Sequence, residues 1–176
     1  MLGVIDTEAG NIQSVNNALM RIGASPEIVA DAEGVMRADA LVLPGVGAFA
    51  PAIASLEERG IANAIRRRVL EDGRPLLGIC LGMQLLADRS DENGAHKGLG
   101  LVPGRVMPLD PAGGADRVPN FGWHDTVPTK TGMLFPDPDE VRSFYFAHSY
   151  HFVCDHSDAV ASTIGFGSGQ VTAAVE

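Results

Sequence analysis

The chain has 176 residues, 45% of them hydrophobic and 20% charged, a balance typical of one globular domain with its own core. Its 13 Lys and Arg against 22 Asp and Glu give a net charge of −9, which argues against nucleic acid and anionic membranes as partners. Two cysteines, no apolar run of membrane-spanning length and no signal peptide predict a cytoplasmic protein without a disulfide framework.

Short apolar runs alternate with segments of helical periodicity in the first half. Strands are predicted at 2–5, 26–29, 40–43 and 76–79, and helices at 12–22 with Asn11 as N-cap, 51–58, 61–71 and from 81 until the pattern fades at 88–94. The run at 76–79 has the continuous apolar character of a buried strand. This alternation predicts an α/β fold, a doubly wound and mostly parallel sheet with helices on both faces. Ligands of such sheets bind outside the carboxyl ends of the strands.

The segment Gly78-Ile79-Cys80-Leu81-Gly82 joins the last of these strands to a helix, which is the thiol form of a nucleophile elbow. We expect the turn to force Cys80 into a strained backbone conformation. Gly78 and Gly82 are expected because a side chain there would collide with the adjoining strand and helix. The Leu81 N–H is a candidate oxyanion donor beside Cys80. Inert burial of Cys80 in the core is the alternative that these residues leave open.

The segment Pro44-Gly45-Val46-Gly47-Ala48-Phe49 follows the strand at 40–43. Glycines in such a loop let backbone N–H groups approach a ligand, so the loop is a candidate source of a second oxyanion donor beside Leu81. Taken alone, these residues favour an ordinary turn, because proline and glycine occur in most loops.

The second half, from Gly104 onward, consists of short predicted strands separated by turns. They are expected at 105–109, 126–127, 143–147, 151–154, 159–164 and 171–175, as antiparallel hairpins. His148, His151, Cys154 and His156 lie close together in this half, as metal ligands often do. Alternation along a strand places His148 and His151 on opposite faces, which argues against a metal site. One of these histidines is instead a candidate base for Cys80.

Four segments together resemble the class I (triad) glutamine amidotransferases, and among them the glutaminase subunits of imidazole glycerol phosphate synthase. They are Asp6 with Gly10-Asn11, Pro44–Phe49, Gly78–Leu86, and Tyr145-Phe146-Ala147-His148-Ser149-Tyr150. The resemblance runs the whole length of the chain. It implies the class I glutaminase fold, with neither cofactor nor metal.

The resemblance also implies a reaction and a set of site residues. Cys80 would attack the side-chain amide of glutamine and form a glutamyl thioester, with the oxyanion held by N–H groups of Leu81 and of Val46 or Gly47. The positions that would hold glutamine are Gly45, Gln84, Glu92, Ser149 and Tyr150. Ammonia would pass to a (β/α)₈ cyclase partner that makes imidazole glycerol phosphate in histidine biosynthesis. Asn11 and Trp123 match positions near that partner.

The chain departs from the family at three places. Thr7-Glu8-Ala9 replaces a Tyr-Gly, and Asn120-Phe121-Gly122-Trp123-His124 replaces His-Met-Gly-Trp-Asn, which leaves open a paralogue that serves another partner. The family's His-Pro-Glu, which supplies base and acid, does not occur in the 176 residues. We therefore expect residues 1–176 to be a single amidotransferase domain whose natural chain continues beyond Glu176. A non-catalytic partner-binding subunit, and a cysteine hydrolase with His148 as base, are the alternatives.

Overall fold

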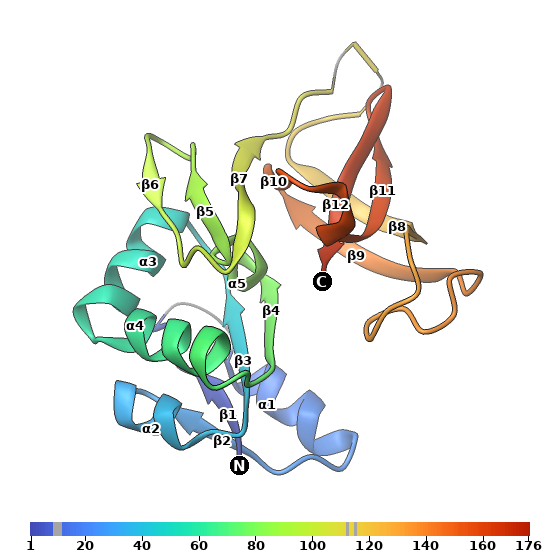
Figure 1. Cartoon of the computed structure of the whole chain (residues 1–176). Coiled ribbons are helices and arrows are strands. Elements are labelled where there is room, and N and C mark those ends of the chain that lie inside the picture. Colours follow the sequence, from blue (N-terminus) through green and yellow to red (C-terminus); the bar gives the residue numbers. More distant parts are fainter. Residues whose placement is uncertain (9–11, 112, 115) are drawn as a thin grey trace. The chain divides into compact units, whose positions relative to one another are not determined.

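Four short apolar runs of the first half form a parallel sheet, as predicted, in the computed structural model (Figure 1), which describes residues 1–8, 12–111, 113–114 and 116–176. The strand order is β2-β1-β3-β4, and the strands are β1 (Leu2–Ile5), β2 (Pro26–Val29), β3 (Ala40–Gly45) and β4 (Leu76–Cys80). In register, Leu2 pairs with Ala40, and Gly45 at the end of β3 pairs with Cys80 at the end of β4. The carboxyl ends of three strands therefore meet at one edge of the sheet.

Helices cover both faces of this sheet, with α1 on one side and α2, α3 and α4 on the other (Figure 1). They are α1 (Ile12–Arg21), α2 (Ala32–Arg37), α3 (Phe49–Glu58), α4 (Ile61–Arg66) and the π-helix η1 (Arg67–Glu71). The sequence predicted all except α2, a six-residue helix too short to show a periodicity. Asn11, the predicted N-cap of α1, lies outside the described residues.

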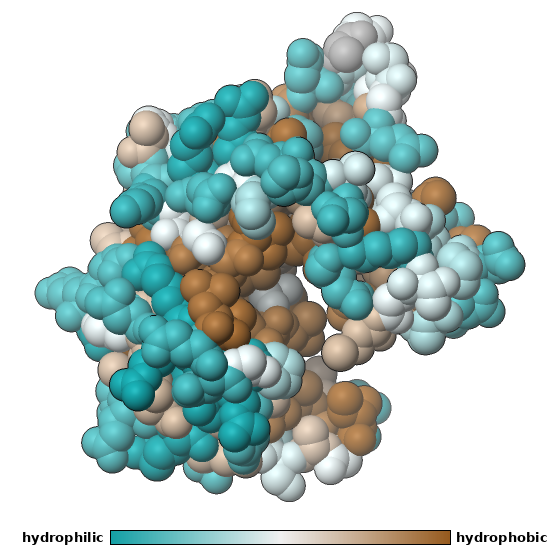
Figure 2. Space-filling view, viewed as in Figure 1, coloured by the Kyte–Doolittle hydropathy of each residue, from teal (hydrophilic) through white to brown (hydrophobic). Residues whose placement is uncertain are grey.

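The core of the first unit lies between the sheet and the helices on the α3 side. It contains fully buried side chains from strands and helices, among them Ile5, Leu43, Leu56, Ile61 and Ile65. Each such side chain stabilises the fold by about 1.5–3 kcal/mol relative to an exposed position. Figure 2 shows a largely hydrophilic surface over α2 and α3. Of the helices in the described ranges, none combines the length and the apolar stretch that a membrane crossing requires.

Two predictions about the region of β4 were wrong. Its apolar run was expected to be buried, but Leu77 is 42% and Ile79 38% exposed. The strand lies last in the sheet order, and α5 (Leu81–Gln84) packs only on the face of Gly78, where a Cβ would come within 2.7 Å of Met83. Because successive side chains of a strand point to opposite faces, Leu77 and Ile79 project away from that helix.

The helix after Cys80 was predicted to continue until its pattern fades at 88–94, but α5 ends at Gln84. The chain continues instead into β5 (Ala87–Ser90) and β6 (His96–Lys97). Backbone N–H groups of Leu99 and Leu101 donate to the carbonyls of Leu85 and Leu86, at 2.8 and 2.9 Å. These long-range bonds use the carbonyls of Leu85 and Leu86, which a longer helix would need for its own hydrogen bonds. The helix therefore ends although the helical periodicity of the sequence continues.

Antiparallel strands make up most of the remaining chain, as predicted. They are β7 (Val102–Pro108), β8 (Asn120–Pro128), β9 (Arg142–His148), β10 (Tyr150–Cys154), β11 (Val160–Phe166) and β12 (Gly169–Val175), with the 3₁₀ turn η2 (Ser157–Ala159) before β11. One sheet has the order β12-β11-β8-β9, and β10 pairs with β7. The strand predicted at 126–127 is the end of the nine-residue β8.

The chain divides into two compact units, each described by itself. The first comprises Met1–Arg89 and His96–Leu101, and the second Ser90–Ala95 and Val102–Glu176. The second unit has a small core of its own, formed by Leu109, Ile164, Phe166 and Val171. That residues 1–176 act as a single amidotransferase domain stays a prediction.

Candidate active site

Cys80 ends β4 and immediately precedes α5, the strand–turn–helix arrangement predicted for it. Its backbone has φ 56° and ψ −116°, a conformation that non-glycine residues rarely adopt. The thiol is exposed. A strained backbone that presents an exposed nucleophile is the geometry of an active-site elbow, and inert burial of Cys80 is wrong.

Gly78 and Gly82 make this turn possible. A Cβ on Gly82 would lie 1.7 Å from the carbonyl oxygen of Leu43 in β3, and one on Gly78 would lie 2.7 Å from the backbone of Met83 in α5. Both distances are far below van der Waals contact, and the atoms met are backbone. The predicted steric reason for the two glycines is confirmed.

The loop after β3 approaches the elbow closely. Gly45 is the register partner of Cys80, and a Cβ on Gly45 would come within 3.0 Å of the Gly82 nitrogen. Gly47 has φ 92°, a value that favours glycine. Leu81 is the first residue of α5, where an N–H has no acceptor within the helix. The backbone N–H groups of this loop and of Leu81 therefore remain the candidate oxyanion donors.

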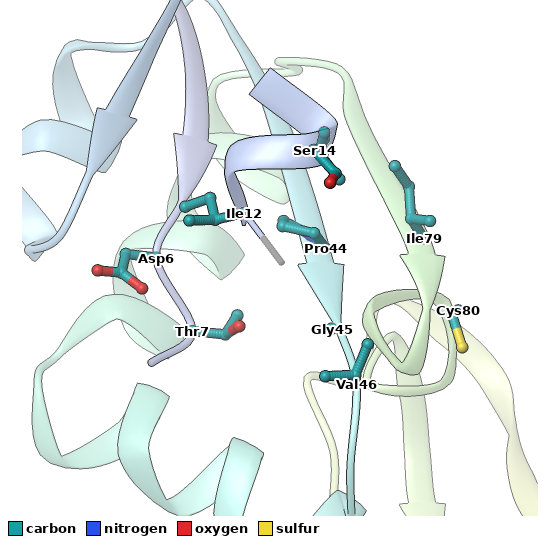
Figure 3. A pocket seen from close by; sticks show the side chains of 10 residues that line it. Asp6, Thr7, Ile12, Ser14, Pro44, Gly45, Val46, Ile79 and Cys80 are labelled. Carbon is teal, nitrogen blue, oxygen red and sulfur yellow. The ribbon is translucent and has the colours of Figure 1, made fainter. Parts of the chain in front are cut away.

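A pocket of about 190 Å³ opens at the carboxyl ends of β1, β3 and β4 (Figure 3). It is lined by Asp6, Thr7, Ile12, Ser14, Val15, Pro44, Gly45, Val46, Ile79 and Cys80. Sequence reasoning assigned Gly45, Val46 and Cys80 to the site but missed Asp6, Thr7 and the first turn of α1. Their signal was position alone, because they follow the carboxyl end of β1, where such sheets bind ligands.

The guanidinium of Arg59, at the end of α3, holds one wall of this pocket. It donates to the carbonyl of Asp6 at 2.8 Å and to the carbonyl of Ala30 at 2.7 Å. The Ser55 hydroxyl donates to the Glu8 carboxylate at 3.0 Å. Two strand ends and the segment that carries Asp6 and Thr7 are thereby tied to one helix.

Replacing Arg59 with methionine is expected to lower the free energy of unfolding by about 2–3 kcal/mol, because two carbonyls lose a charged donor. Urea denaturation measures the change. Arg67→Met is the matched control, since Arg67 is 63% exposed and its ion pair with Glu71, at 3.7 Å, lies on the surface; we expect no measurable effect there. Equal losses in the two variants would contradict the role given to Arg59.

The residues that the resemblance assigns to glutamine fall in both units. Gln84 lies half-buried in α5 of the first unit, whereas Glu92, Ser149 and Tyr150 belong to the second. The Ser149 carbonyl accepts from the Leu109 N–H at 2.9 Å, and the Glu92 N–H donates to the Ser90 hydroxyl at 3.1 Å. The placement of these three residues beside Cys80 stays a prediction.

His148 is engaged at both ring nitrogens within the second unit. Its Nε2 lies 3.0 Å from Asn120 Nδ2, and its Nδ1 lies 2.9 Å from the Tyr150 carbonyl oxygen. A base for Cys80 needs a ring nitrogen open to the thiol proton, so this arrangement argues against His148 in that role. Within the described residues, no three His, Cys, Asp or Glu side chains are grouped as metal ligands are.

A comparison with known families matches residues 3–168 to glutamine amidotransferase class-I. The chain belongs to the class I glutamine amidotransferases. The match includes the elbow, the loop at Pro44–Phe49 and the segment at His148–Tyr150, so the family predicted from these motifs is confirmed.

Relatives of this amidotransferase specify the subfamily. The imidazole glycerol phosphate synthase subunit HisH of Chlorobaculum tepidum is 38% identical over 176 residues, which are 100% of this chain and 86% of that protein. The imidazole glycerol phosphate synthase hisHF of Arabidopsis thaliana is 41% identical over 171 residues, 96% of this chain and 28% of that longer protein. A crystal structure of a glutamine amidotransferase, 22% identical, gives a TM-score of 0.71 over 97% of this chain and 87% of that one, which confirms the fold.

Proposed function

We propose that this amidotransferase hydrolyses glutamine through a thioester on Cys80 and delivers the ammonia to a (β/α)₈ cyclase partner, within imidazole glycerol phosphate synthesis. The single observation that carries the proposal is the strained, exposed Cys80 of an amidotransferase elbow, set opposite Gly45 at the edge of a ligand pocket. The predicted cytoplasmic location belongs to the same proposal.

The Cys80 sulfur attacks the side-chain amide carbon of glutamine, and the carbonyl oxygen becomes an oxyanion. The Leu81 N–H and an N–H at Val46 or Gly47 stabilise that charge because they are fixed before the reaction begins. The C–N bond then breaks, the thiol proton leaves with ammonia, and water hydrolyses the thioester to glutamate. The base that carries the proton is assigned to no residue of the 176, which contain no His-Pro-Glu.

Five residues are proposed to hold the substrate: Gly45, Gln84, Glu92, Ser149 and Tyr150. For Gly45, the assignment is supported by the close approach of its backbone to the elbow that carries Cys80. The others rest on their match to the family's motifs.

The partner is supported by the names of the relatives and by an exposed aromatic face on the second unit. The Chlorobaculum protein is a subunit of the synthase, and the Arabidopsis protein carries a much longer chain under the synthase name. The aromatic face consists of Phe121, Trp123 and Tyr145, which are 65%, 72% and 58% exposed. Trp123 pairs with Tyr145 across β8 and β9, with ring centroids 5.8 Å apart. Exposed aromatic side chains of this kind are typical anchors of protein interfaces.

Glutamate formation from glutamine by the natural-length protein, measured with and without a HisF-type cyclase, tests the proposal. We expect glutamate in the presence of the cyclase and, with an electrophilic glutamine analogue, one covalent adduct on Cys80. A chain that binds the cyclase and forms neither glutamate nor adduct would favour the non-catalytic subunit.

Trp123→Ala is expected to raise the dissociation constant of the complex with the cyclase by about 10- to 100-fold, because tryptophans that become buried on complex formation are typical interface hot spots. Isothermal titration calorimetry measures the constant. Met133→Ala is the control, since Met133 is 85% exposed and lies outside the aromatic face. An unchanged constant for Trp123→Ala would remove this face from the interface.

A further inference from the structure

Three polar side chains that the proposed catalysis does not use form a continuous hydrogen-bonded chain in the second unit. His124 Nε2 lies 2.9 Å from Asn120 Oδ1, and Asn120 Nδ2 lies 3.0 Å from His148 Nε2. His148 Nδ1 lies 2.9 Å from the carbonyl oxygen of Tyr150. Asn120 is only 6% exposed, so its amide depends on these partners.

The register of β8 and β9 creates this chain. Asn120 lies directly opposite His148, and Gly122 lies opposite Phe146. Asn120 and His124 share a face of β8 with Gly122 between them, because side chains alternate between the two faces of a strand. The Phe146 ring packs against both imidazoles, with centroids 5.6 Å from each.

The partners determine where each ring carries its proton. A carbonyl oxygen only accepts, so His148 Nδ1 donates to Tyr150. An amide nitrogen only donates, so His148 Nε2 accepts from Asn120 and carries no hydrogen. Asn120 Oδ1 in turn accepts from His124 Nε2. His148 is therefore neutral, as the Nδ1–H tautomer, and His124 carries a hydrogen on Nε2.

We propose that Asn120 is a positioning residue: it orients His148 as the neutral Nδ1–H tautomer, and the oriented ring holds the main chain of Ser149–Tyr150, the segment assigned to glutamine. The second part rests on the proposed function. The segment is then held at two successive carbonyls, that of Ser149 by the Leu109 N–H at 2.9 Å and that of Tyr150 by His148.

The surroundings of His148 favour the neutral ring. Burial lowers the pKa of His148, the Tyr150 carbonyl raises it, and the charge of His124 lowers it further. The titratable group that acts on this ring is His124 on β8. His148 in turn acts on His151 of β10, where burial and then the charge of His148 lower the pKa. Protonation of His148 would place its Nε2–H opposite the Asn120 Nδ2–H, so two donors would face each other. Relief requires the Asn120 amide to turn over, after which Asn120 Nδ2 donates to His124 and His124 Nε2 must give up its hydrogen.

Nuclear magnetic resonance of ¹⁵N-labelled protein tests the first part without any substrate. Long-range ¹H–¹⁵N spectra distinguish the two ring nitrogens, and we expect the Nδ1–H form for His148 and the Nε2–H form for His124. On acidification the two rings should change together. The Nε2–H tautomer of His148, or titration of His148 with no change at His124, would overturn the proposal.

Two substitutions at Asn120 separate orientation from mere packing. Asn120→Leu removes the partner of His148 Nε2 at similar volume, so the KM for glutamine is expected to rise about three- to tenfold with little change in kcat. Asn120→Asp keeps an acceptor for a doubly protonated His148, which still donates to Tyr150. It is expected to restore the KM and to move the His148 titration upward by about one to three pH units.

Ser143→Ala is the matched control, because the Ser143 hydroxyl bonds Asp125 across the same two strands on their opposite face. We expect it to leave the ring spectra and the KM unchanged. An Asn120→Leu variant with lower stability and an unaltered KM would overturn the positioning of the glutamine segment. Absence of glutamine hydrolysis in the unaltered protein would overturn the proposed function, and the ring tautomers would still decide the role of Asn120.

Discussion

Replacing Cys80 with alanine is expected to reduce glutamine hydrolysis in the cyclase complex by roughly 10⁴- to 10⁶-fold, because removal of a catalytic nucleophile abolishes the covalent route. The fold should remain, since Cys80 is exposed and its thiol fills no core position. Glutamate release measures the loss, and circular dichroism verifies the fold. Residual turnover above about 1% of the unaltered rate would show that Cys80 is not the nucleophile.

Cys154→Ala is the matched control for this experiment. Burial and the neighbouring Asp155 charge raise the pKa of the Cys154 thiol to about 11, although Lys130 opposes the shift, so this thiol stays protonated at pH 8. We expect full activity in this variant. Iodoacetamide at pH 8 should alkylate Cys80 and spare Cys154, which becomes reactive only as the pH approaches 11. Mass spectrometry of tryptic peptides reports both sites.

Gly82→Ala is expected to lower the free energy of unfolding by about 3 kcal/mol or more, because the new Cβ would lie 1.7 Å from the Leu43 carbonyl oxygen. This collision is relieved only if β3 and α5 move apart. That movement would also displace Leu81 from the oxyanion. The expected fall in the midpoint of thermal unfolding is about 6–12 °C for a chain of this size.

Gly165→Ala controls for the general effect of losing a glycine. Gly165 lies in β11, and a Cβ there would meet nothing within 4 Å. Its unfolding midpoint should stay within about 2 °C of the unaltered protein. Equal midpoints for Gly82→Ala and Gly165→Ala would mean that the elbow tolerates a side chain and that the steric argument is wrong.

Much of the fold was predictable from local patterns. Continuous apolar runs marked β1 and β3, and periodic apolar positions marked α1 and α3. The helix α2 has six residues and no such pattern, so it was missed. The end of α5 and the strand β5 were missed because the carbonyls of Leu85 and Leu86 accept from residues 99 and 101. Backbone groups are alike at every residue, so side-chain patterns do not show which ones will pair.

The candidate site divides in the same way. Cys80 and its two glycines were predicted because the collisions that require glycine arise where the segment 78–83 folds on itself and against β3. Asp6 and Thr7 were missed because their place in the pocket depends on the carboxyl ends of separate strands lying at one edge. The aromatic and polar faces of β8 became distinguishable only once its register with β9 was known.

Local residue patterns were therefore enough to predict the family, the alternation of strands and helices, and the strained cysteine at the end of β4. Each depends on residues a few positions apart, where sterics and periodicity act directly. The folded chain was needed to show that Arg59 holds the Asp6 carbonyl and that Asn120 faces His148, 53 and 28 residues apart. Such contacts depend on strand register and helix docking, which many distant residues set together.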